Sequence, residues 1–183
     1  MTQQAVIQAT RQWVENVVVD LNLCPFARRE LVNNRVRFAV TEARTTDALL
    51  GGLQQELMKL VDDDSIETSL LIHPGVLQDF HDYNDFLAVA DGLVDILELE
   101  GVIQIASFHP HYQFAGTTAD AAENYTNRSP YPMLHLLREA SLERAIAAYP
   151  DTDAIPQRNI ERVEALGQDA MKALLAACQP RNQ

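Results

Sequence analysis

Lysine is scarce in this chain: Lys59 and Lys172 are its only lysines, against 12 arginines. Basic residues as a whole are outnumbered, because 26 acidic residues against 14 basic ones give a formal net charge of -12. A polyanion such as DNA or an acidic membrane surface is repelled at long range by such a charge. We therefore expect neither a nucleic acid nor a membrane as a partner.

Cysteine is almost as rare, and the two that occur, Cys24 and Cys178, lie far apart without the spacing of a metal site. The first residues lack the basic and apolar regions of a secretory signal. No run approaches the roughly 20 apolar residues that a membrane helix needs. These absences predict a cytoplasmic protein with reduced thiols and no disulfide framework.

Only 7 glycines are present, and the glycine-rich motifs that hold nucleotide phosphates do not occur. The nucleophile motif G-x-S-x-G and the redox motif C-x-x-C are missing as well. These absences argue against ATP-dependent and dinucleotide chemistry of the usual kinds. The cofactor, if the chain uses one, stays unknown.

What is present is an ordinary globular composition, with 47% hydrophobic and 22% charged residues in 183. No repeat, low-complexity tract or flexible linker divides the chain, which predicts a single globular domain over residues 1–183. Spacing of the apolar residues then predicts the following helices and strands in order. They are a helix over 5–21, a strand over 36–41, a helix over 45–61, a strand over 67–72, helical pieces up to 100, a strand over 102–108, a long connection over 109–130, and helices over 130–148 and 155–178.

A helix-length segment separates each of the predicted strands from the next, and such crossovers make neighbouring strands parallel. We therefore expect an α/β protein with a small, mostly parallel sheet of three to four strands flanked by helices. Arg37 and Gln104 fit this expectation poorly, since strands covered on both faces are normally apolar throughout. A two-layer α+β sandwich of the ferredoxin-like kind is the alternative.

Two predicted strands end abruptly in His-Pro, at His73-Pro74 and at His109-Pro110, and His111 follows the second. Ligands of parallel sheets bind outside the carboxyl ends of the strands, so we expect these histidines to meet at one edge. Histidine transfers protons near neutral pH and also binds metals as the neutral ring. His109 is therefore the candidate general acid/base, with His73 or His111 assisting it.

Arg128 and Asn127 come directly before the helix predicted over 130–148, where free backbone amides favour an anion. His135 and Arg138 lie three residues apart on that helix. Together these four residues and His111 form the predicted binding set for a carboxylate or phosphate. The alternative is that the arginines pair with nearby acidic residues and only fix the loop.

Cys24 is a candidate nucleophile, although it follows a predicted helix end, which raises a thiol pKa, and free cysteines are commonly small buried hydrophobes.

Three longer motifs resemble those of an uncharacterised bacterial domain-of-unknown-function family, number 1415. They are the segments 21–27 (LNLCPFA), 108–116 (FHPHYQFAG) and 124–132 (NYTNRSPYP). The resemblance spans nearly the whole chain and implies a bacterial protein of one domain. It implies no activity, because none is known for that family.

Three hypotheses follow from the sequence. The first is a small enzyme, a hydrolase or group transferase, that acts on an anionic metabolite through a His/Arg pocket. The second is a non-catalytic module that binds or senses such an anion, and the third is a metalloprotein with His73, His109 and His111 as ligands. A homo-oligomer is compatible with all three.

Overall fold

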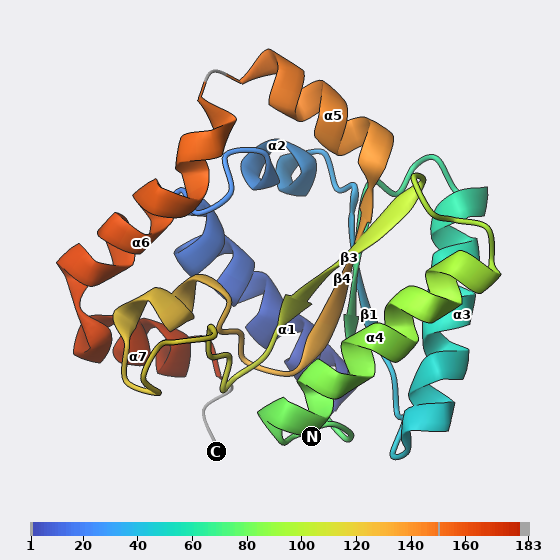
Figure 1. The fold of residues 1–183 in the computed structure, drawn as a ribbon, viewed down its shortest axis with the longest axis horizontal. Coiled ribbons are helices and arrows are strands. Elements are labelled where there is room, and N and C mark those ends of the chain that lie inside the picture. Colours follow the sequence, from blue (N-terminus) through green and yellow to red (C-terminus); the bar gives the residue numbers. More distant parts are fainter. Residues whose placement is uncertain (1, 150, 180–183) are drawn as a thin grey trace.

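The computed structural model describes residues 2–149 and 151–179, which form helices around one sheet (Figure 1). No helix in these two ranges is long and apolar enough to cross a membrane. The sheet consists of β1 (Val36–Val40), β2 (Thr68–Ile72), β3 (Ile103–Phe108) and β4 (Met133–Arg138). The helical elements are α1 (Gln3–Trp13), the π-helix η1 (Val14–Val19), α2 (Ala27–Val32), α3 (Thr46–Asp62), α4 (Phe80–Ile96), the 3-10 helix η2 (Ala122–Thr126), α5 (Glu139–Ala148), the 3-10 helix η3 (Thr152–Ala154), α6 (Ile155–Leu166) and α7 (Gln168–Ala177).

The strands are ordered β1-β2-β4-β3, and this order confirms a small sheet flanked by helices. β1 and β2 are parallel, as the crossover through α3 predicts. β4 lies between β2 and β3 and is antiparallel to both, which corrects the expectation of a mostly parallel sheet. The sheet is mixed, with one parallel and two antiparallel pairs, and the chain is α+β overall, the class of the alternative expectation. β1, β2 and β3 nevertheless run in the same direction, and their carboxyl ends meet at one edge of the sheet.

β4 corrects the predicted helix over 130–148, whose first half is a strand and whose second half alone is helical, as α5. β4 is a central strand with apolar residues on both faces, and Met133, Leu134 and Leu136 are fully buried. Such a strand has no apolar–polar alternation, and periodicity alone does not distinguish it from a buried helix. Pro132 is the signal against the helix, because a proline disfavours helical geometry in the residue before it.

Helices cover both faces of the sheet, and each face has its own apolar core (Figure 1). α3 and α4 cover one face, where Leu71 of β2 and Leu134 of β4 lie. α1 and η1 cover the other face, and Val163 of α6 belongs to the same core. Trp13 packs edge-on against Phe108 in this core, with the ring centroids 5.1 Å apart. Alternate residues of each strand therefore face opposite cores.

The C-terminal helix predicted over 155–178 is divided in two by Gly167, whose φ of +81° ends α6 and begins α7. At the other end of the chain, the helix predicted over 5–21 changes from α to π geometry at Val14. The change coincides with the run Val17-Val18-Val19, whose β-branched side chains restrict an α-helix.

Candidate functional site

The structure brings His73 and His109 to the same edge of the sheet, directly after β2 and β3. The ring of Tyr83, from α4, lies between them, with its centroid 5.8 Å from that of His73 and 5.0 Å from that of His109. Phe80 and His111 lie on the outer side of His109, at centroid distances of 5.4 Å and 5.9 Å. The strand-end histidines are thus part of an aromatic cluster.

Tyr83 ties this cluster to the sheet. Its hydroxyl donates to the carbonyl of Met133 at 2.8 Å and accepts the backbone N–H of Phe108 at 3.0 Å. The hydroxyl therefore replaces a direct hydrogen bond between the end of β3 and the start of β4. Burial raises the pKa of Tyr83, so the phenol stays protonated and acts as a structural bridge.

Removing this bridge with Tyr83→Phe leaves the N–H of Phe108 and the carbonyl of Met133 unpaired at a fully buried position. We expect the free energy of unfolding to fall by about 2 kcal/mol, the typical effect of unsatisfied buried polar groups. Urea denaturation measures the change. A loss below about 0.5 kcal/mol would show that the two strands close directly on each other without the hydroxyl.

His109 is fully buried, and both of its ring nitrogens have partners. Nε2 donates to the carbonyl of Leu77 at 3.2 Å, and Nδ1 accepts the backbone N–H of His111 at 3.0 Å. Burial lowers the pKa of His109 to about 4, which keeps the ring neutral near pH 7. His109 therefore joins the loop after β3 to the loop after β2. His111 is exposed and lies beside it.

His73 is also fully buried, and its Nδ1 donates to the carbonyl of Val76 at 3.1 Å. Nε2 is then the unprotonated nitrogen, and it has no partner among the residues that the structure describes. Burial lowers the pKa of His73 to about 4. No three His, Cys, Asp or Glu side chains in the described ranges converge so as to hold a metal ion, His73, His109 and His111 included.

Arg128 and Asn127 hold the long connection after β3 in place. The Arg128 guanidinium donates to the carbonyls of Tyr112 at 3.1 Å and Ala119 at 2.7 Å. It also stacks 4.6 Å over the ring of Tyr125. The Asn127 amide donates to the carbonyl of Ser107 at 3.1 Å. The element that follows these residues is β4 and not the predicted helix, so no helix N-terminus lies directly after Arg128 to attract an anion.

Arg138 and His135 lie away from the histidine edge. β4 starts with Met133, beside the end of β3 that precedes His109. It ends with Arg138, which pairs with Ile103 at the opposite end of β3. The Arg138 guanidinium caps the end of α3 by donating to the carbonyls of Leu60 and Asp63.

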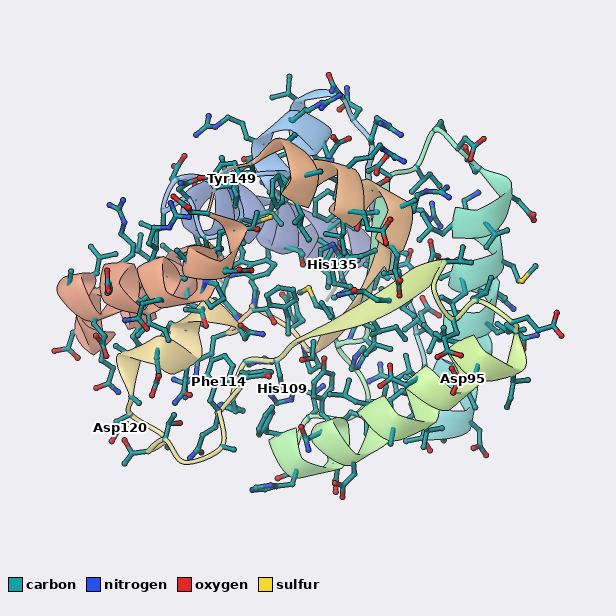
Figure 2. All side chains as sticks on the ribbon, turned by 45° about the horizontal axis from the view of Figure 1, so that its top comes forward. Asp95, His109, Phe114, Asp120, His135 and Tyr149 are labelled. Carbon is teal, nitrogen blue, oxygen red and sulfur yellow. The ribbon has the colours of Figure 1, made fainter. Side chains whose placement is uncertain are left out.

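His135 faces the core under α1 and η1, and its Nε2 lies 2.7 Å from the Thr68 hydroxyl. The Thr68 hydroxyl donates in turn to the carbonyl of Leu136, so Nε2 of His135 carries the proton. Burial lowers the pKa of His135 to about 4. Figure 2 shows His135 and His109 on opposite sides of the β3 ribbon.

Cys24 lies in the turn after η1 and is half-buried. Burial raises the pKa of its thiol, although two backbone N–H groups partly oppose this effect. A raised pKa disfavours the thiolate, which is the nucleophilic form. The turn itself is tied to α6, since the Asn159 amide donates to the carbonyl of Leu23 at 2.7 Å.

A different group of polar side chains surrounds a cavity of about 80 Å³ between this turn and α6. The lining residues are Leu21, Asn22, Pro25, Tyr149, Ile155, Arg158, Asn159 and Arg162. Arg158 donates to the carbonyls of Asp151 and Ala154. Arg162 makes no hydrogen bond or ion pair to any described residue, and neither arginine is paired with a described carboxylate.

Sequence reasoning missed this cavity, although two signals point to it. Asn22 and Pro25 belong to the motif over 21–27, and Asn22 adopts a left-handed φ of +53°, which asparagine tolerates better than most residues. Arg158 and Arg162 are four residues apart and therefore lie on the same face of a helix. What the sequence does not show is that this face meets the turn at 20–26.

Comparison with known proteins adds a family and no activity. No protein of curated function and no solved structure matched the chain. The family model described as "Protein of unknown function (DUF1415)" matches residues 5–173, a span that includes all of the lining residues of the cavity. The chain therefore belongs to the DUF1415 family of proteins of unknown function.

Proposed function

We propose that this protein binds a small anionic molecule, and that it holds the anionic group of that molecule in the cavity between the turn at 20–26 and α6. The observation that carries the proposal is that Arg158 and Arg162 both line this cavity without a carboxylate partner among the described residues. Other arginines, such as Arg11, Arg44 and Arg144, also have no ion pair among the described residues, and Arg158 and Arg162 differ from them in lining one cavity together without an acid partner. Two neighbouring guanidiniums without one favour an anion from outside.

The size of the cavity limits what it can hold. Its volume of about 80 Å³ is that of two to three water molecules at roughly 30 Å³ each. A phosphate or a carboxylate group fits this volume. The rest of the molecule would therefore lie outside the cavity, along the exposed side chains of Arg158 and Arg162.

The start of α6 also favours an anion. Ile155, Arg158 and Asn159 lie in the first turns of α6, where the helix dipole is positive. The Asn159 amide donates to the carbonyl of Leu23 and holds the two walls together before any ligand binds. A site built in advance loses less conformational entropy on binding than one that must be ordered.

Binding suits this site better than turnover. Its lining residues in the described ranges include no histidine, cysteine or carboxylate, the groups that most often transfer protons or attack a substrate. The strand-end histidines are fully buried, and His109 uses both ring nitrogens inside the protein. The anion-binding module is therefore the hypothesis that the geometry supports best.

Calorimetric titration with inorganic phosphate, sulfate and citrate tests the proposal. We expect saturable binding of at least one of these anions, weakened at least about tenfold by Arg162→Gln, because a charged hydrogen bond contributes roughly 1.5–3 kcal/mol. Arg162→Gln leaves every internal contact of the described residues in place, so the thermal stability without ligand should not change.

Arg144→Gln is the matched control. Arg144 is an exposed arginine of α5 that donates to the Ser141 hydroxyl at 2.8 Å and does not line the cavity. This variant should bind the anion as the natural chain does. An equal loss of anion affinity in both variants would contradict the proposal, because it would mean a general response to the charge of the protein. Absence of binding to the natural chain at about millimolar anion would also contradict it.

A further inference from the structure

β3 is an edge strand whose outer side lies open. In both figures it is drawn with no helix or strand across it (Figures 1 and 2). Its six residues, Ile103–Phe108, include no charged residue and no proline. Natural proteins commonly protect an exposed edge strand with charged residues or proline, because its unpaired backbone groups can otherwise pair with another strand. β1, the other edge strand, carries Arg37.

The hydrogen bonds of β3 show which backbone groups face outward. Glu139 donates its N–H to the carbonyl of Val102, so in the antiparallel ladder Gln104 and Ala106 bond to β4. The N–H and carbonyl groups of Ile103, Ile105 and Ser107 therefore point to the outer side.

Two of these six outward groups are already paired within the protein. The N–H of Ile103 donates to the carbonyl of Leu99 at 3.0 Å, and the carbonyl of Ser107 accepts from the Asn127 amide at 3.1 Å. Four groups are left without a partner among the described residues: the carbonyl of Ile103, both groups of Ile105 and the N–H of Ser107.

We propose that two copies of this chain pair through β3, antiparallel, with Ile105 of one copy opposite Ile105 of the second copy. In this register the two Ile105 residues exchange two hydrogen bonds. The N–H of each Ser107 donates to the carbonyl of Ile103 in the other copy. All four free groups of each strand are then paired and none is left over.

This pairing of all free backbone groups favours a second copy of the chain over a strand of another protein. The groups that are already paired, the N–H of Ile103 and the carbonyl of Ser107, would oppose each other across the two-fold axis in the same register. The edge is thus closed at both ends and open only over the self-complementary middle. Val102, directly before β3, is 46% exposed and adds apolar surface at this end of the strand.

Ser107→Pro is the variant that tests the pairing. Proline removes an N–H that faces outward and that makes no hydrogen bond within the described chain, and edge strands tolerate proline at such positions. Sedimentation velocity on the full chain from about 1 to 200 µM should show a dimer for the natural sequence, with dissociation at least about tenfold easier for Ser107→Pro. Ser107→Ala keeps the N–H and should dimerise as before.

The register has its own test. Ile105→Cys should form an intermolecular disulfide under mild oxidation, because residues opposite each other in a hydrogen-bonded pair have Cα atoms about 5.5 Å apart. Gln104→Cys should cross-link much less, since Gln104 faces Ala106 of the second copy. The unsubstituted chain, with only Cys24 and Cys178, controls for other cross-links.

A monomer at every concentration overturns the proposal, even if an added peptide binds β3. A dimer that Ser107→Pro leaves unchanged also overturns it, because the interface then lies elsewhere. If circular dichroism shows that Ser107→Pro does not fold, the contrast between Ile105→Cys and Gln104→Cys decides.

Discussion

Lowering the pH from about 7 to about 4 is expected to remove on the order of 5 kcal/mol from the free energy of unfolding, through three histidines that the fold keeps neutral. Burial lowers the pKa of His73, His109 and His135 to about 4 in each case. His73 and His109 have no exposed surface at all. A natural domain has only about 5–15 kcal/mol of stability, so the effect approaches acid unfolding.

The direction follows from the protons bound by each state. In the unfolded chain these histidines have a pKa of about 6.5, above the folded values. Above about pH 6.5 the histidines are neutral in both states, and they contribute no pH dependence. Between about 6.5 and 4 the unfolded chain binds protons that the folded chain does not, so stability falls as the pH falls. Asp91, whose pKa is raised by burial and by Asp95, acts weakly in the opposite direction.

Urea denaturation at a series of pH values measures this profile. His73→Gln should flatten it, because one of the three groups with a lowered pKa is gone. His81→Gln is the matched control, since His81 is exposed on α4 and is not one of the three buried rings. A free energy of unfolding that stays constant between about pH 6.5 and 4.5 would contradict the prediction.

Meeting of the strand-end histidines was predictable from the sequence, because it depends only on strand direction. A helix-length crossover aligns two strands, and the residues after them then share an edge. The chemistry predicted for His109 depended on more than direction. Whether Nε2 is free or donates to Leu77 is decided by a loop whose path no local pattern shows.

The predicted grouping of Arg128 with Arg138 depended on one element, the helix expected over 130–148, whose first half is β4. Arg128 and Arg138 were grouped because a helix was expected to follow Arg128 and to carry Arg138. Because these residues form a strand, Arg138 lies at the far end of β4, about 17 Å from Met133 at roughly 3.4 Å per residue. The cavity that has two arginines joins residues more than 130 positions apart, as the bond from Asn159 to Leu23 shows. The periodicity of apolar residues carries no information on contacts between residues so far apart in the sequence.

Arg37 and Gln104, which fit poorly in a covered parallel sheet, are explained by strand order. β1 and β3 are the two edge strands, so neither residue lies in the middle of the sheet. Gln104 is exposed. Arg37 reaches from β1 to the carboxylate of Glu56 on α3, and the Ser69 hydroxyl donates to the same carboxylate at 3.0 Å. Glu56 is only 7% exposed, and Arg37 and Ser69 supply the hydrogen bonds of its carboxylate.

Arg37→Met is therefore expected to lower the free energy of unfolding by about 3–5 kcal/mol, because it leaves a buried carboxylate without its countercharge. The double variant Arg37→Met, Glu56→Met should recover most of this loss, since an apolar pair of similar size avoids burying either charge. Arg28→Met is the control: Arg28 pairs with Asp20 on the surface, where their side chains are 69% and 64% exposed and an ion pair contributes about 1 kcal/mol or less. Urea denaturation of the four proteins tests this. If the double variant were as unstable as Arg37→Met, the loss would come from packing around Arg37 and not from the uncompensated charge of Glu56.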